Sequence, residues 1–269
     1  MKKYNRYLNF LYLLFLCSCS SSKTDLFDPS SLNAGLDSIK DSETIYGPTK
    51  KNLTGFVDKT SDYGLDGLIA TNFSLVDLNR DGFTDIMILP EYFSQPIFLR
   101  FDIHKGKFEK MESPFIGNVK ASYILFYDLN NDKILDAIVG VLNQKTEMAQ
   151  NPIRIFRGSY ENKKLVLREE DGVIPAAPAP SSSVGLIDFD LDGDLDLYIA
   201  NWFQKTKKGT FPHRDYLLKN DNGKYSDVTD IMLGETKQNG SKTMYTNAIP
   251  SFATQICDMD QNGFPDILT

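Results

Sequence analysis

The hydrophobic residues of this chain fall largely into short runs that are bounded by aspartate, asparagine, glycine or proline. Runs such as Ile86–Leu89, Ala137–Val141 and Leu197–Ala200 are rich in bulky, β-branched or aromatic side chains. Short runs of this kind between turn residues predict β-strands. We therefore expect an all-β protein.

The predicted strands form sets of four along the chain. The first set covers residues 73–76, 86–89, 96–102 and 107–110; the second 122–127, 137–141, 153–157 and 165–168; the third 183–187, 197–200, 216–219 and 224–228; and the fourth begins with 252–257 and 267–269. Four strands per unit, repeated along a chain, predict a β-propeller, whose blades avoid long open edges by radial repetition.

A nine-residue acidic loop separates the first two predicted strands of each set. These loops, called loops one to four below, cover residues 77–85, 128–136, 188–196 and 258–266, and their starts are 51, 60 and 70 residues apart. Each loop carries aspartate or asparagine at its first, third, fifth and ninth positions. Loops one, three and four have glycine at the sixth position, whereas loop two has Lys133.

The loop pattern predicts calcium binding. Alternate residues of an extended segment point the same way, so positions one, three and five can converge on one cation. Oxygen ligands suit Ca²⁺, and glycine at position six permits the positive φ that turns the loop back. With a position-seven carbonyl and the position-nine carboxylate added, the predicted ligands of up to four ions are Asp77, Asn79, Asp81, Phe83, Asp85, Asp128, Asn130, Asp132, Ile134, Asp136, Asp188, Asp190, Asp192, Asp194, Asp196, Asp258, Asp260, Asn262, Phe264 and Asp266.

The acidic loops have two other possible interpretations. An EF-hand needs flanking helices and a glutamate at loop position twelve, but that position holds Ile88, Val139, Ile199 and Thr269. The EF-hand is therefore rejected. Acidic turns without metal are the second alternative, and they are disfavoured because clustered carboxylates repel one another.

The four loops are not equivalent in sequence. Loop three has aspartate at all four ligand positions, so we expect it to bind calcium most tightly. Loop two is expected to be the weakest site, because Lys133 replaces glycine and places a positive charge beside the ion. Extracellular calcium modules typically bind at about 10⁻⁴–10⁻³ M, which suits a structural ion rather than a sensor.

The loops and their flanking phrases resemble FG-GAP/VCBS repeats. The phrases are Phe56-Val-Asp-Lys-Thr60 with Gly64-Leu65, and Leu217-Leu-Lys-Asn220 with Gly223-Lys-Tyr-Ser-Asp-Val-Thr229. Such repeats form the propellers of integrin α-subunits and of many bacterial surface proteins, including those ending in an ASPIC/UnbV domain. The resemblance covers about residues 54–269, and no ASPIC/UnbV segment is visible. It implies seven or so blades, calcium between the first two strands of each blade, and a role in adhesion or in glycan or protein binding.

The length does not match a closed ring of that kind. Seven blades of about sixty residues need roughly 420 residues, and the chain has 269. We therefore expect an open arc of about 3.5 blades from a fragment of a longer protein. A complete chain that pairs with another chain is the alternative.

The acidic charge is concentrated in the predicted sites. The formal net charge is −7, and Lys2, Lys3 and Arg6 contribute +3, which leaves −10 for the remainder. Fourteen of the 36 acidic residues lie in the four loops, so four calcium ions would bring the remainder to about −2. No basic patch dominates, which argues against nucleic acid as a partner.

The N-terminal segment predicts export. Residues 1–19 contain a basic start, a short apolar core at Phe10–Leu16 and Leu16-Cys-Ser-Cys19, which resembles a bacterial lipobox with Cys19 as the lipidated residue. We expect an outer-membrane lipoprotein that faces the exterior and contacts the membrane only through its lipid, with a plain secretory signal as the alternative. Residues 20–53 predict a flexible tether, although Thr44–Tyr46 could add an edge strand.

No catalytic motif stands out. The sequence has no Gly-x-Ser-x-Gly elbow, phosphate loop or histidine-rich zinc signature, and both histidines are predicted at the surface. The best candidate for a binding surface is the segment 202–215, which is expected to be a loop. Its candidate ligand-binding residues are Trp202, Lys205, His213 and Arg214.

Two functional hypotheses follow from the sequence. The favoured one is a non-enzymatic, calcium-stabilised module on the cell surface that binds a glycan or a protein. The alternative is a polysaccharide-active enzyme whose catalytic residues lie in a missing C-terminal part. Calcium-dependent binding without turnover would favour the first hypothesis, and release of soluble oligosaccharide would favour the second.

Overall fold

The computed structural model describes residues 57–142, 153–175, 179–206, 209–232, 248 and 250–269. The chain divides into two compact units, Met1–Lys59 and Thr60–Thr269, and the second unit holds every strand named below. The predicted signal segment 1–19 with Cys19 and the predicted tether 20–53 lie outside the described residues.

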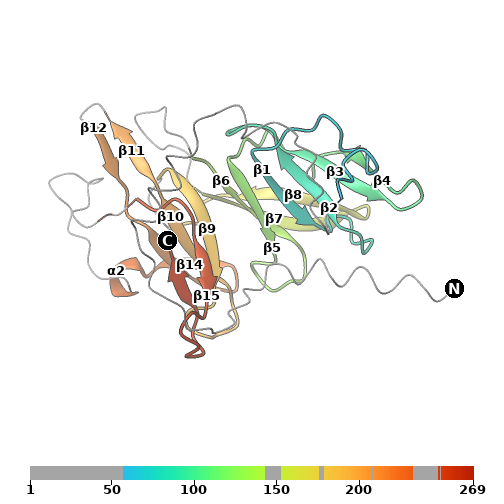
Figure 1. Cartoon of the computed structure of the whole chain (residues 1–269). Coiled ribbons are helices and arrows are strands. Elements are labelled where there is room, and N and C mark those ends of the chain that lie inside the picture. The colour runs from blue at the N-terminus through green and yellow to red at the C-terminus, as the bar shows by residue number, and fades with distance from the viewer. Residues whose placement is uncertain (1–56, 143–152, 176–178, 207–208, 233–247, 249) are drawn as a thin grey trace. The chain divides into compact units, whose positions relative to one another are not determined.

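The described strands form three four-stranded sheets and two hairpins (Figure 1). All strand pairs within them are antiparallel. The first sheet contains β1 (Asn72–Val76), β2 (Asp85–Leu89), β3 (Ile97–Asp102) and β4 (Lys107–Met111), and the second contains β5 (Tyr123–Tyr127), β6 (Asp136–Gly140), β7 (Arg154–Glu161) and β8 (Lys164–Glu170). In both sheets neighbouring strands follow the order of the chain.

The third sheet follows the same order with one insertion. It contains β9 (Ser181–Ile187), β10 (Asp196–Asn201), β13 (Tyr216–Asp221) and β14 (Lys224–Asp227), after which α2 (Thr229–Met232) makes a single helical turn. The hairpin of β11 (Phe203–Thr206) and β12 (Gly209–Pro212) lies between β10 and β13 in the chain. The last hairpin contains β15 (Gln255–Cys257) and β16 (Asp266–Leu268).

These strands confirm the all-β prediction and the four-strand sets, with one correction. Each predicted strand overlaps an observed one, and the three sheets are separate four-stranded units that do not close on themselves. The segment 202–215 was predicted as a loop, and this is wrong because it contains the β11–β12 hairpin. The sequence there is rich in polar and basic residues, while the pairing of Phe203 with Pro212 depends on contacts that a local pattern does not reveal.

Consecutive sheets pack against each other through hydrophobic clusters. The first cluster joins residues of the first sheet, such as Met87 and Phe98, to Ile124 and Phe156 of the second. A second cluster in the same way joins the second sheet to the third, and a third joins the third sheet to the β15–β16 hairpin. Both faces of the second and third sheets are therefore buried, which explains why β6 and β10 are fully buried runs rather than alternating ones.

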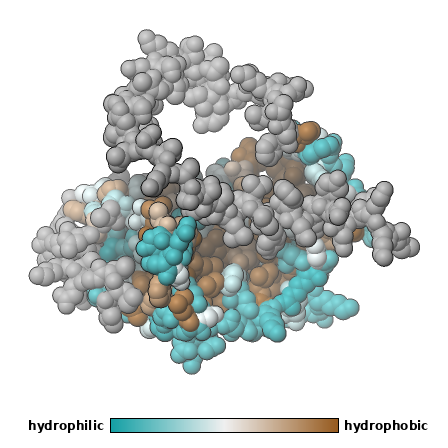
Figure 2. All heavy atoms as spheres, turned by 60° about the horizontal axis from the view of Figure 1, so that its bottom comes forward, coloured by the Kyte–Doolittle hydropathy of each residue, from teal (hydrophilic) through white to brown (hydrophobic). Residues whose placement is uncertain are grey.

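One face of β1 carries exposed hydrophobic side chains. Phe73 is 62% exposed and Leu75 is 53% exposed. In the space-filling view of Figure 2, hydrophobic residues reach the surface at several places among hydrophilic ones. Leu75 and Phe126 occupy equivalent positions in the first and second sheets, because Leu75 pairs with Ile86 and Phe126 pairs with Ala137. Phe126 packs against the first cluster. The exposed Leu75 of the first sheet is therefore equivalent to a side chain that the second sheet packs against the first sheet.

Gly158 marks the closest approach of β7 to loop two. A Cβ atom at this position would lie 2.0 Å from the carbonyl oxygen of Leu135. The backbone is fixed there because the Gly158 N–H donates to Asp136 Oδ1 at 2.8 Å. Only glycine fits this position without moving the loop.

We expect Gly158→Ala to destabilise the protein by roughly 2–3 kcal/mol, because the new methyl group must push loop two away from β7. Urea unfolding followed by circular dichroism would measure this change. Ser159→Ala, at the next residue, removes only the contact of an exposed hydroxyl with Arg168 and should cost about 0.5 kcal/mol or less. Equal losses in the two variants would contradict the steric argument.

Candidate functional site

The four acidic loops lie where the sequence predicts them. Each one connects two adjacent antiparallel strands: β1 to β2, β5 to β6, β9 to β10, and β15 to β16. Each loop is therefore the turn of a β-hairpin rather than the centre of a helix pair. This confirms the geometric part of the argument against an EF-hand.

The carboxylate at position one holds each loop in a closed turn. Asp77 accepts the N–H of Asp81 on Oδ1 at 3.2 Å and the N–H of Gly82 on Oδ2 at 2.9 Å. The same two bonds, from positions five and six, are made by Asp128, Asp188 and Asp258. One carboxylate thus satisfies two backbone donors, and it does so identically in four places.

The backbone turns at positions four and six of every loop. Position six has φ of 85° at Gly82 and 67° at Lys133, so the lysine of loop two adopts the conformation predicted for glycine. Position four also has positive φ, for example 58° at Arg80 and 59° at Leu191. A side chain in this region costs on the order of 1 kcal/mol. The amide bonds to position one offset that cost.

In loops one to three, position nine is buried and links its loop to the third strand of the sheet. Asp85 has no exposed surface and accepts the N–H of Leu78 on Oδ2 and the N–H of Phe101 on Oδ1, both at 3.1 Å. The same pair of bonds, from position two and from the third strand, is made by Asp136 and Asp196. Asp266 of loop four accepts the N–H of Met259 at 2.8 Å.

Burial changes the ionisation of these position-nine carboxyls. Burial raises the pKa of Asp85 and of Asp196 to about 6, while the two backbone N–H groups lower it and the neighbouring loop carboxylates raise it further. Burial likewise raises the pKa of Asp136, although the Gly158 N–H and the Arg157 guanidinium act in the opposite direction. A cation bound beside these groups would favour their ionised form.

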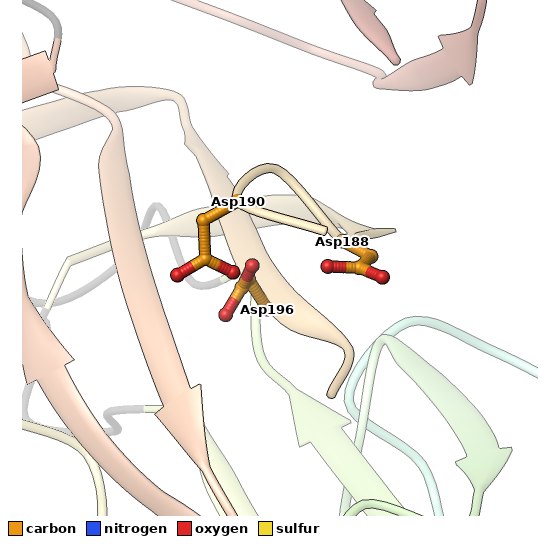
Figure 3. Close-up of side chains that lie close together, drawn as sticks. All are labelled: Asp188, Asp190 and Asp196. Atoms are coloured by element: carbon orange, nitrogen blue, oxygen red, sulfur yellow. The ribbon is translucent and has the colours of Figure 1, made fainter. Parts of the chain in front are cut away.

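Loops three and four gather three carboxylates each. Carboxylate oxygens of Asp188, Asp190 and Asp196 all lie within 4.8 Å of one another, and Figure 3 shows these side chains around the turn of loop three. The equivalent residues of loop four, at positions 258, 260 and 266, meet the same distance. Both clusters consist of hard oxygen donors, which match the ligand preference of Ca²⁺ and Mg²⁺.

Loops one and two replace the position-three carboxylate by an amide. Asn79 donates from Nδ2 to Asp81 Oδ2 at 2.9 Å, and its Oδ1 accepts the Asp81 N–H at 2.9 Å. Asp81 also accepts the N–H of Phe83 at 2.8 Å, and the equivalent bonds occur in loop two. The predicted residues of positions one to seven are therefore brought together in one hydrogen-bonded turn, with N–H groups inside it that the sequence pattern does not reveal.

In the second and third sheets, a basic residue of the third strand forms an ion pair with acidic residues of the loop. Lys219 forms ion pairs with Asp190 and with Asp192, the second at 3.0 Å. These carboxylates raise the pKa of Lys219, and the Asp194 N–H together with Lys219 lowers the pKa of Asp192. Arg157 lies 3.0 Å from Asp136 Oδ2 in the second sheet. Sequence reasoning missed both residues, although each directly precedes the third-strand residue that donates to position nine.

Polar bonds also connect the second and third sheets. Asn131 at position four of loop two donates to Asp194 of loop three at 2.6 Å. Asn220 donates to the carbonyl of Leu129 at 2.9 Å, and Arg157 donates to the carbonyl of Gly223 at 2.6 Å. The side chain of Asp194, whose carbonyl was predicted as a ligand, is thus used to join two loops.

Two of the predicted binding residues of segment 202–215, His213 and Arg214, are buried or mostly buried. His213 is only 1% exposed, so its predicted surface position is wrong: its Nδ1 lies 3.0 Å from the Arg214 carbonyl, and burial lowers its pKa. Arg214 is mostly buried and pairs with Asp227 and Asp230. Trp202 packs edge-on against Phe203 and Phe252. The side chain of Lys205 lies outside the described part of the chain.

Asp215 is a further acidic group that sequence reasoning missed. It accepts hydrogen bonds from the Tyr198 hydroxyl at 2.7 Å, the Asn201 N–H at 2.7 Å and the Ser251 hydroxyl at 2.5 Å. Burial raises its pKa, against these hydrogen bonds. The Asp215 carboxylate connects Ser251, in the segment before β15, to Tyr198 and Asn201 of β10. Because it accepts three hydrogen bonds, we assign it a structural role.

Comparison of the sequence with protein-family models and with curated proteins finds no match. The resemblance to FG-GAP/VCBS repeats therefore stays a prediction based on the residues quoted above. Among the described residues, no helix has the length and apolar character needed to cross a membrane.

The raised pKa of Asp85 and Asp196 predicts an unusual pH dependence in EDTA. Their folded-state pKa of about 6 exceeds the ordinary value of 3.8, so folding favours their protonated form. Their stabilising contribution is complete below about pH 3.8 and is lost as the pH rises through about 6. We expect the double variant Asp85→Asn, Asp196→Asn to show a smaller loss of unfolding free energy than the wild type between about pH 4.5 and about pH 7.

Urea unfolding at both pH values measures this difference. Asp171→Asn, which changes an exposed acid outside the loops, is the control and should leave the pH dependence unchanged. Parallel pH profiles for the double variant and the wild type would show that the buried carboxyls do not titrate in this range.

Proposed function

We propose that this chain is a calcium-stabilised β-propeller module of a bacterial cell surface, where it binds a glycan or a protein. The observation that carries the proposal is the loop architecture: four loops far apart in the sequence share one hydrogen-bonding scheme around clustered oxygen donors. An ordinary acidic turn has no reason to repeat such a scheme four times.

The residues present fit calcium. Loop three offers the carboxylates of Asp188, Asp190, Asp192 and Asp196, and two of the four loops already hold three carboxylates within 4.8 Å. Calcium takes six to eight oxygen ligands in flexible geometry, so carbonyl groups and water can complete each set. A bound ion would supply the positive charge that keeps these carboxylates together.

The packing of the sheets supports a propeller. Four-stranded sheets follow one another along the chain, and each packs its face on the next through a hydrophobic cluster. The exposed Phe73 and Leu75 lie at positions that are used for sheet packing in the second sheet. We propose that they contact a further sheet of the same kind.

The role in binding rests on the resemblance to FG-GAP/VCBS repeats and on the predicted lipoprotein signal with Cys19. A lipid-anchored module outside the cell is exposed to calcium at concentrations near the affinity of extracellular sites, about 10⁻⁴–10⁻³ M. A structural ion would then be present where the protein acts. The partner is accordingly proposed to be a surface glycan or protein rather than a nucleic acid.

Calcium should raise the thermal stability of the protein. We expect a rise in Tm of at least about 5 °C between EDTA and about 5 mM CaCl₂, because ligand binding to the folded state alone shifts the unfolding equilibrium. Differential scanning fluorimetry measures it. Asp190→Asn and Asp260→Asn should each reduce the rise, whereas Asp171→Asn, an exposed acid outside the loops, should not. An identical Tm in EDTA and in calcium would contradict the proposal.

Binding and turnover can be separated in one assay. The protein is mixed with insoluble polysaccharides such as cellulose, chitin and a bacterial surface polysaccharide, in calcium or in EDTA. We expect calcium-dependent retention on a polymer without release of soluble reducing ends. Release of oligosaccharide would favour the enzyme hypothesis instead, and retention that EDTA leaves unchanged would contradict a calcium-dependent binding surface.

A further inference from the structure

The third strand of each four-stranded sheet carries a basic residue at the same structural position. In the first sheet it is Arg100, in the second Arg157 and in the third Lys219. Each directly precedes the residue whose N–H donates to the position-nine carboxylate of the same sheet. The three sheets therefore share a basic residue at the same backbone position, directly before the donor to the position-nine carboxylate.

The three basic side chains have different partners. Arg100 lies 3.6 Å from Glu109 on the neighbouring strand β4. Arg157 lies 3.0 Å from Asp136 and also pairs with Glu170. Lys219 alone reaches the acids at positions three and five of its loop, Asp190 and Asp192. Loop three, the most acidic of the four, thus holds a cation of its own.

We propose that the Lys219 ammonium is a built-in counter-ion of loop three that calcium must displace, so that loop three binds calcium more weakly than its carboxylates alone would. This inference rests on the calcium binding proposed above. It also removes part of the advantage that the sequence gives to loop three, which is ranked tightest because all four of its ligand positions are aspartate.

The chemistry of lysine suits a displaceable counter-ion. An ammonium group is a compact charge on a flexible stem, so it can leave for solvent without distorting the strand. The side chain of Lys219 is about one-third exposed, whereas Arg157 is mostly buried and also binds the Gly223 carbonyl. Arg157 is therefore fixed in place, and Lys219 is the residue that can exchange with a metal.

Two consequences distinguish a counter-ion from an ordinary surface ion pair. Without calcium, Lys219 offsets repulsion among the carboxylates and stabilises the loop. With calcium, it opposes binding, because a positive charge must leave or stay beside the ion. Removing the ammonium should therefore weaken the metal-free protein and strengthen calcium binding at the same time.

The test uses a background in which the other three loops bind calcium more weakly. Asp81→Asn, Asp132→Asn and Asp260→Asn remove one carboxylate from each other loop while keeping the Oδ1 acceptor of its turn. In this background Lys219→Met should tighten calcium binding by roughly tenfold in isothermal titration calorimetry and lower the Tm in EDTA. Arg100→Met, the equivalent change in the first sheet, is the matched control and should leave the affinity of loop three unchanged. Lys219→Gln serves as a second variant should Lys219→Met fold poorly.

The outcomes separate this inference from the proposed function. Tighter binding together with a lower Tm in EDTA supports the counter-ion. Equal calcium affinity in the Lys219→Met and Arg100→Met variants overturns it and leaves calcium binding itself intact. Absence of calcium binding in the unmodified protein up to about 10 mM, well above the roughly 10⁻⁴–10⁻³ M of extracellular sites, overturns the proposed function and this inference with it.

Discussion

In the three four-stranded sheets, the bonds between the position-nine aspartate and two backbone N–H groups are the constraint on which the rest of the structure depends. A buried carboxylate is costly unless its oxygens are satisfied, so Asp85 and its equivalents require one donor from the loop and one from the third strand. That requirement fixes the distance between the acidic loop and the strand two places further along the chain. It therefore sets both the shape of the loop and the register of the sheet.

Much of this architecture could be predicted from sequence because it is local. A strand such as β2 is a compact run of bulky residues, and an aspartate at every second position followed by glycine marks a turn wherever it occurs. The prediction fails where structure depends on contacts between distant segments. His213 is followed by arginine and aspartate, which suggests a surface position, yet packing from other strands buries it. The positive φ at Arg80, Asn131 and Leu191 was also missed, since these residues share no chemical type.

The candidate site shows the same division between local and distant information. Spacing alone identified the side chains that converge in each loop, including the six acids of the two metal-sized clusters. Spacing could not reveal that Lys219, on a different strand, forms ion pairs with acids of loop three. It also could not reveal that Arg157 forms an ion pair with Asp136. Counting charge along the chain treats all fourteen loop acids as available to metal. The fold instead assigns several of them to backbone amides and basic side chains before any ion binds.

The bonds between the second and third sheets mean that the repeats are not independent units. Repeat proteins fold as rows of modules whose coupling depends on the contacts between neighbours. Here Asn131 reaches Asp194, and Arg157 reaches the turn at Gly223, so a change in one loop alters a hydrogen-bond partner of the next. Loops two and three of this protein should consequently respond to a change in either one together, because each contributes a partner to the hydrogen bond that joins them.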